Sequence, residues 1–126
     1  KKNILLFFLP FYLFPQAPTI DWIKPYGGTG VDQIRTIVEL ATGEWLICGT
    51  SFSPISGNKT APQWGNADFW VVKTDATGNI VWNKTYGGNA YDELYGAVIS
   101  ADGNIFLWLI VSVLLHFTLC ILSLFE

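Results

Sequence analysis

Short apolar or alternating stretches, separated by glycine-containing turns, run through the middle of the 126-residue chain. Residues 32–40 place Ile34, Thr36, Val38 and Leu40 against more polar neighbours, which is the period-2 pattern of a strand. The stretches are rich in Val, Ile, Trp, Phe and Tyr, the residues that favour strands. The pattern predicts strands at residues 33–40, 44–51, 69–74, 79–86, 93–100 and 104–107, and hence an all-β fold.

Three of the expected turns share one sequence pattern. Ala41-Thr42-Gly43, Ala76-Thr77-Gly78 and Ala101-Asp102-Gly103 each stand between two expected strands. A three-residue hairpin needs a positive φ at its last position, which glycine supplies without steric cost. The pattern therefore predicts three antiparallel hairpins.

The chain also contains an internal repeat with a period of sixty residues. Aligned without a gap, residues 20–43 and 80–103 share ten of 24 positions, counted directly from the sequence. The identities include Trp22 and Trp82, two tyrosines and a Gly-Gly pair. Fixed periods of this kind are typical of solenoids, propellers and other repeat architectures.

Four strands fall within one period, and four antiparallel strands per repeat is the content of a propeller blade. We therefore expect about one and a half blades in residues 18–107, a blade at 20–79 and a partial second blade at 80–107. Trp22 and Trp82 are expected to occupy equivalent, buried positions on successive blades.

The motifs Asp68-x-Trp70-Val-Val-Lys, Trp82-x-Lys84 and Tyr86-Gly-Gly, followed by Asp92, resemble a repeat of bacterial secreted β-propeller proteins of the Bacteroidetes type. The resemblance covers about residues 21–106. It implies a large extracellular protein that is non-catalytic or of unknown activity, of which this chain would be a fragment. The other blades of the parent protein would then be its partners.

Both ends of the chain are apolar. Lys1 and Lys2 precede an apolar stretch, Ile4–Phe14, and Ala17 offers a small residue for cleavage. Residues 1–17 therefore resemble an export signal, which predicts a secreted or cell-surface location, with a retained anchor or a buried strand as the alternatives.

The apolar residues Trp108–Phe125 form most of the tail, residues 108–126. In apolar surroundings a helix satisfies every backbone group, so residues 108–125 are expected to form a helix, with Ser112, His116 and Cys120 on one side. This helix would be either a membrane anchor or the product of a frameshift. The loss of the repeat pattern after Leu107 favours the frameshift.

Charge and residue types narrow the function. Residues 21–102 carry five basic and nine acidic residues, a net charge of −4, which argues against nucleic acid as a partner. His116 is the only histidine and has no carboxylate near it in the sequence, so a catalytic triad is not expected. The dispersed Cys and His residues do not suggest a zinc site, and no cofactor is expected.

Asp32 and Asp92 follow the Gly-Gly pairs at equal distance. A repeated aspartate of this kind is expected to accept hydrogen bonds from loop N–H groups rather than to bind a ligand or calcium. The best candidate contact surface is the long loop 52–67, because loops of this length are usually functional. Within and beside it, Trp64, Asn58 and Asp68 are the candidate ligand contacts, and Trp64 either packs on its own sheet or offers its ring to a sugar or peptide.

These patterns predict an exported, non-catalytic binding or structural scaffold whose ligand is an extracellular glycan or protein. A small membrane-anchored protein with an extracellular β domain, in contact with the membrane through residues 108–125, is the main alternative. An enzyme on a propeller scaffold is a third, for which the sequence supplies no residues.

Overall fold

A computed structural model describes residues 19–100, 104–111 and 116–122, and side chains up to residue 107. The described residues contain strands and no helix, as the pattern predicted. The strands are β1 (Asp32–Glu39), β2 (Trp45–Ser51), β3 (Asp68–Thr74), β4 (Ile80–Tyr86), β5 (Asp92–Ile99), β6 (Ile105–Val111) and β7 (His116–Leu122).

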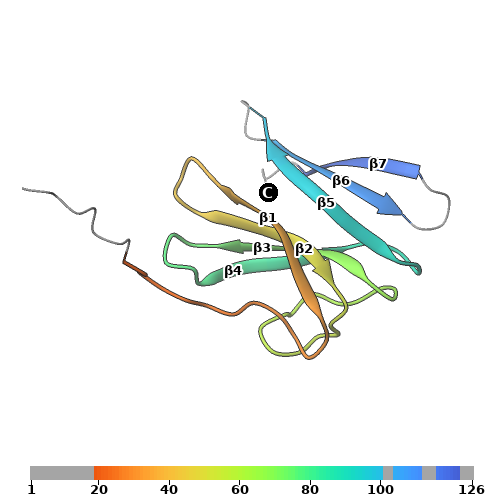
Figure 1. The fold of residues 1–126 in the computed structure, drawn as a ribbon, viewed down its shortest axis with the longest axis horizontal. Coiled ribbons are helices and arrows are strands. Elements are labelled where there is room, and N and C mark those ends of the chain that lie inside the picture. The colour runs from red at the N-terminus through yellow and green to blue at the C-terminus, as the bar shows by residue number, and fades with distance from the viewer. Residues whose placement is uncertain (1–18, 101–103, 112–115, 123–126) are drawn as a thin grey trace, which may run out of the picture.

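The strands form two antiparallel sheets that pack face to face (Figure 1). Sheet 1 has the order β1-β2-β3-β4, so each strand pairs with its neighbour in the sequence. The predicted four-stranded antiparallel sheet over residues 33–86 is thereby confirmed. Sheet 2 has the order β5-β6-β7, and its first strand lies against β1, β2 and β3.

Glycine closes the two hairpin turns that the structure describes. Gly43 has a φ of 81° between β1 and β2, and Gly78 has a φ of 79° between β3 and β4. Both values lie in the left-handed region that favours glycine. Residues 101–103 lie outside the described residues, although β5 and β6 pair as that turn predicts.

The hairpins β1–β2 and β5–β6 have the same pairing register. Asp32 opposes Ser51 in the first, and Asp92 opposes Val111 in the second, so each partner number differs by 60. The register shift after Ile34 recurs after Leu94. The second hairpin thus repeats the geometry of the first up to Val111, past the point where the sequence similarity ends.

The expected helix at residues 108–125 is wrong for the residues that the structure describes. Residues 108–111 continue β6, and residues 116–122 form β7, which pairs with β6 along its whole length. A paired strand satisfies backbone N–H and C=O groups as a helix does, and pairing overrides the helix propensity of leucine. Ser112 lies outside the described residues, and His116 and Cys120 are strand residues.

The main hydrophobic core lies between the two sheets. From the inner face of sheet 1 come Leu46, Cys48, Phe69 and Val71, and from sheet 2 come Leu94, Ile105 and Leu107, all buried. Backbone and polar contacts add to this packing, because Thr50 Oγ1 accepts a hydrogen bond from Leu94 N at 3.1 Å. Sheet 2 therefore covers the inner face of sheet 1.

A smaller core covers the opposite, outer face of sheet 1. It contains Ile47, Trp70 and Val72, together with Ala61 from the long loop and Tyr26 from the chain before β1. The chain before β1, residues 20–26, is called the strap here. The strap runs along the side of sheet 1 that faces away from sheet 2 (Figure 1).

Two contacts at the β3–β4 turn hold the strap. Tyr26 Oη donates to Gly78 O at 2.8 Å, and Lys24 Nζ donates to the side chain of Asn79. The expected equivalence of Trp22 and Trp82 is wrong, because Trp82 lies in β4 whereas Trp22 lies outside any strand and is 41 % exposed. A strand needs a pairing partner, and none of the described strands pairs with the strap.

Residues 1–17, expected as an export signal, lie outside the described residues. Within the described part of the chain, no helix is long and apolar enough to cross a membrane.

Truncation of Leu94 tests the inter-sheet core. Leu94 is 0 % exposed, so Leu94→Ala removes buried apolar area and leaves a cavity. We expect a loss of about 2–5 kcal/mol in the free energy of unfolding, measured by urea titration. The control Val81→Ala, at a residue that is 55 % exposed, should change it by no more than about 0.5 kcal/mol. Equal effects of the two variants would contradict the assigned core.

Asp75 should make the β3–β4 turn sensitive to acid. Hydrogen bonds from the backbone and side chain of Asn79 and from Thr77 lower the pKa of Asp75 to about 2. Because this pKa lies below the ordinary value of 3.8, its contribution to stability is present above pH 4 and lost as the pH falls through 2. Urea titrations at pH 5 and pH 2 should therefore show a smaller difference for Asp75→Asn than for the unaltered chain. An unchanged difference would show that the carboxylate contributes nothing.

Candidate ligand-binding site

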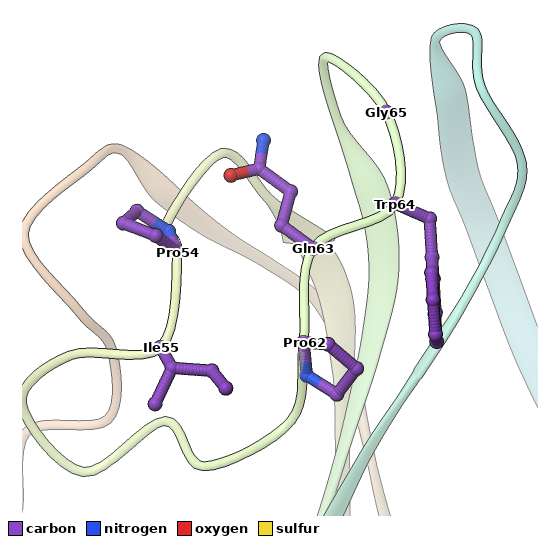
Figure 2. Close-up of a pocket in the computed structure, with 6 residues that line it drawn as sticks. All are labelled: Pro54, Ile55, Pro62, Gln63, Trp64 and Gly65. Atoms are coloured by element: carbon purple, nitrogen blue, oxygen red, sulfur yellow. The ribbon is translucent and has the colours of Figure 1, made fainter.

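The loop between β2 and β3 forms a hollow of about 450 Å³ between its two arms. One arm contributes Pro54 and Ile55, and the other contributes residues 62–65 (Figure 2). No charged residue lines the hollow. Its lining is therefore suited to a neutral ligand.

Lys59 links the two arms of the loop through hydrogen bonds from its buried side chain. Its side chain is 1 % exposed, and Nζ donates to Ser53 O at 2.8 Å and to Ala61 O at 3.1 Å. Burial lowers the pKa of Lys59, and the nearby carboxylates of Asp32 and Asp68 oppose this shift. The ammonium group thus holds one carbonyl of each arm, so the hollow is shaped before any ligand arrives.

Asp68 fixes the second arm at its base. Its Oδ2 accepts hydrogen bonds from Trp64 N at 2.8 Å and from Gly65 N at 3.3 Å. Asp68 is itself 0 % exposed. The structure therefore encloses the carboxylate of Asp68, which was expected as a ligand contact, beneath the loop, where it positions Trp64.

Trp64 presents its ring to solvent. Its side chain is 59 % exposed, although its backbone is fixed by Asp68, and Figure 2 shows the ring extending from the second arm. Ile55, on the facing arm, is 63 % exposed. Of the two interpretations of Trp64, packing on its own sheet is thus not what the structure shows. An exposed indole on a braced loop offers an apolar face and an N–H donor.

Asn58 belongs to a different hollow. Its side chain donates to Pro25 O and accepts from Gly27 N, both at 2.8 Å, and so ties the end of the loop to the strap. It lines a second hollow of about 410 Å³ together with Asp32 and several glycines. The structure therefore separates Asn58 from Trp64.

The glycine-rich segment 27–30 in this second hollow already uses its N–H groups. Gly28 N donates to Asp32 Oδ2, Thr29 N to Ser56 Oγ and Gly30 N to Ser53 Oγ, each at 2.8–2.9 Å. A phosphate cradle needs such N–H groups directed at the ligand. Here they are directed at side chains of the protein.

Asp32 and Asp92 accept hydrogen bonds from loop N–H groups, as predicted. Asp32 accepts from Gly28 N at 2.8 Å and Asp92 accepts from Gly88 N at 2.6 Å. Asp92 is buried, and its carboxylate lies close to Gly87, as does that of Asp68. Both repeated aspartates therefore organise the Gly-Gly segments.

Among the described residues, no three His, Cys, Asp or Glu side chains gather in a group that could hold a metal ion. The hollow supplies an aromatic face, aliphatic walls and the Gln63 amide, which itself donates to Asn66 O at 3.0 Å. Such groups can stack on a neutral ligand and form hydrogen bonds with it.

Sequence reasoning missed Lys59 and Ile55. A lysine in a long polar loop normally extends into water, and nothing in the local sequence signals its burial. The wider sequence offered one signal. Lys59 is the only basic residue between Arg35 and Lys73, so it is the one side chain in that stretch that can balance the charge of the carboxylates there. An exposed isoleucine between Pro54 and Ser56 carried no signal of its own.

No protein-family model matches the chain, and the search of curated proteins found no match either.

Removal of the Lys59 charge tests the bracing of the loop. Lys59→Met keeps most of the side-chain length but leaves Ser53 O and Ala61 O without their donor. We expect a loss of about 1.5–3 kcal/mol in the free energy of unfolding, measured by urea titration.

The matched control is Lys84→Met, whose exposed ammonium lies 5.4 Å from the centre of the Trp82 ring. Such an exposed cation–π contact is worth about 0.5–1 kcal/mol. If Lys59→Met cost no more than Lys84→Met, the ammonium group would not be what braces the loop.

Proposed function

We propose that the chain is part of an exported, non-catalytic protein of the β-propeller type that binds a neutral glycan through loop 52–67. The observation that carries the binding function is the exposed Trp64, held by a buried carboxylate beside a hollow without charged residues.

The geometry of the loop favours binding over a purely structural role. An exposed tryptophan keeps a large apolar surface in contact with water, which is unfavourable unless a partner covers it. Tryptophan is also prominent among residues that dominate binding energy. The loop is ordered in advance by Lys59 and Asp68, which reduces the entropy that binding must overcome.

A glycan fits the lining better than a charged ligand does. The C–H face of a neutral sugar ring stacks on an indole, and its hydroxyl groups pair with amides and backbone groups. The hollow offers Trp64 for the first interaction and Gln63 for the second. A neutral peptide is the competing ligand, and the experiment below separates the two.

The propeller-type assignment is supported by the four-stranded antiparallel sheet and by the identical register of the two hairpins. The motifs that resemble secreted propeller repeats support it as well. Export is supported by the basic and apolar pattern of residues 1–17.

Trp64→Ala tests the proposed function. The full chain is titrated with neutral oligosaccharides of glucose, galactose and N-acetylglucosamine, and in parallel with a library of uncharged peptides, by isothermal calorimetry. We expect binding of at least one oligosaccharide, weakened by about 30-fold or more in Trp64→Ala, as for a residue that dominates an interface.

The control is Trp22→Ala, which removes a second exposed tryptophan, 41 % exposed, on the strap rather than on the loop. It should bind as the unaltered chain does. Binding that is insensitive to Trp64→Ala would disprove the site, and binding of peptides alone would disprove the ligand class.

A further inference from the structure

Sheet 2 reproduces three of the four strands of sheet 1. Beyond the shared register of the first hairpins, β6 pairs with β7 as β2 pairs with β3. Ile105 in β6 is equivalent to Trp45 in β2 by the sixty-residue period. Ile105 opposes Leu122, as Trp45 opposes Thr74. In sheet 1 a fourth strand, β4, pairs with β3. Among the described residues, no strand pairs with the corresponding edge of β7.

The strap carries the sequence of the strand that sheet 2 lacks. Strap residues Ile20, Trp22, Lys24 and Tyr26 equal Ile80, Trp82, Lys84 and Tyr86 of β4, and Gly-Gly follows in both. The strap nevertheless joins no sheet in the described part of the chain. Its residues Ile20 and Ile23 are 76 % and 81 % exposed.

The side chains of the strap already make the contacts of a fourth strand. Trp82 and Tyr86 of β4 pack against the core between sheets 1 and 2. In the same way, Tyr26 packs on the outer face of sheet 1, and the ring of Trp22 lies against Gly78. The side chains of the strap thus pack against sheet 1 as those of β4 pack against sheet 2. The backbone of the strap, however, pairs with none of the described strands.

The outer face of sheet 1 can also be compared, position by position, with the face of sheet 2 that packs on sheet 1. On the outer face of sheet 1, Ile34 and Ile37 are 57 % and 56 % exposed. Their counterparts in β5 are Leu94, which is 0 % exposed, and Ala97, and both pack between the sheets. The outer face of sheet 1 therefore presents apolar residues at the positions that sheet 2 uses for packing.

The outward face of sheet 2 matches the inner face of sheet 1. Val98 opposes Phe106 as Val38 opposes Leu46. Val38 and Leu46 belong to the core between the sheets, whereas Val98 is 46 % exposed. The exposed β1 part of the outer face of sheet 1 and the outward face of sheet 2 thus each resemble a face that is already in contact within the chain.

We infer that the chain binds a second copy of itself head to tail. The strap of one copy adds to the β7 edge of the next as its fourth strand, and the outward face of that sheet 2 covers the outer face of sheet 1. Strand addition supplies main-chain hydrogen bonds, and the two apolar faces supply burial.

The register of the added strand follows from β3 and β4. Phe69 opposes Tyr86, and Val72 opposes Asn83. The equivalent pairs place Tyr26 opposite Phe117 of the partner subunit and Ile23 opposite Cys120 of the partner subunit. Pro25 stands where β4 has Thr85, and a proline is compatible with the outermost strand of a sheet.

Such a contact is heterologous, because the two copies use different surfaces, so it continues until a ring closes. Each copy contributes two sheets. Closed propellers contain about four to eight sheets, which corresponds to about two to four copies.

The register suggests a cross-linking experiment with the native Cys120. Opposed residues in antiparallel strands have Cα atoms about 4.5–5.5 Å apart, within the range that a disulfide spans. The full chain carrying Ile23→Cys is treated with diamide, which takes up the two electrons and two protons that the thiols lose. We expect a disulfide between position 23 of one copy and Cys120 of another, detected as a dimer band without reductant and identified by peptide mass.

The matched control is Val81→Cys, at an exposed residue of β4 that lies opposite no partner strand in the proposed contact. Burial raises the pKa of the Cys48 thiol to about 12, so Cys48 should not compete in either variant. A link between two copies of position 23, a link within one chain, or equal linking of the control would each overturn the proposal.

Sedimentation of the full chain gives an independent readout. We expect one discrete species of about two to four copies, and Ile37→Asp should weaken the association at least about tenfold by placing a charge in the contact. Val81→Asp is the control and should leave the association unchanged. A monomer at micromolar concentration, or a polydisperse aggregate, would overturn the proposal. Neither result bears on Trp64, so the proposed glycan site stands or falls separately.

Discussion

The packing of the β5–β6 hairpin on the inner face of sheet 1 is the interaction on which the rest of the structure depends. It encloses Leu46, Phe69 and Val71 of sheet 1 against Leu94 and Leu107 of sheet 2. Without sheet 2 the inner face of sheet 1 would lie in water, and burial of apolar area is the dominant favourable term in folding. The Arg35–Glu93 ion pair joins β1 to β5 near the surface, but a partly exposed pair of this kind adds little.

Aspartates at strand ends have a structural role throughout this chain. Asp32, Asp68, Asp75 and Asp92 each accept hydrogen bonds from backbone N–H groups of an adjoining turn or loop. A carboxylate offers several acceptor sites at once, so it can satisfy donors that a turn leaves unpaired. The net negative charge of the chain thus reflects in part how its turns are built.

The sequence predicted what depends on local pattern. Alternation and glycine turns placed the strands of sheet 1, because both signals are contained within a few residues. The continuous apolar run after Leu107 has no period, so its strand character depends on pairing with β5 on one side and, within the run, of β6 with β7, which the pattern of the run does not reveal. The predicted equivalence of Trp22 and Trp82 was wrong for a related reason. Two segments with the same residues form equivalent strands only where each has a neighbouring strand to pair with. In the candidate site, Trp64 was predicted from residue type and loop length, whereas the burial of Lys59 and Asp68 arises only when the loop closes.

The two equivalent connections in the sheets differ greatly in length. Residues 52–67 join β2 to β3, whereas only residues 112–115 join β6 to β7, and yet the strands on either side keep one register. The cost of closing a loop grows slowly with its length, so the sheet tolerates either version. Strand pairing is therefore specified independently of this connection. Natural variation or deliberate grafting can therefore replace the loop without redesign of the sheet beneath.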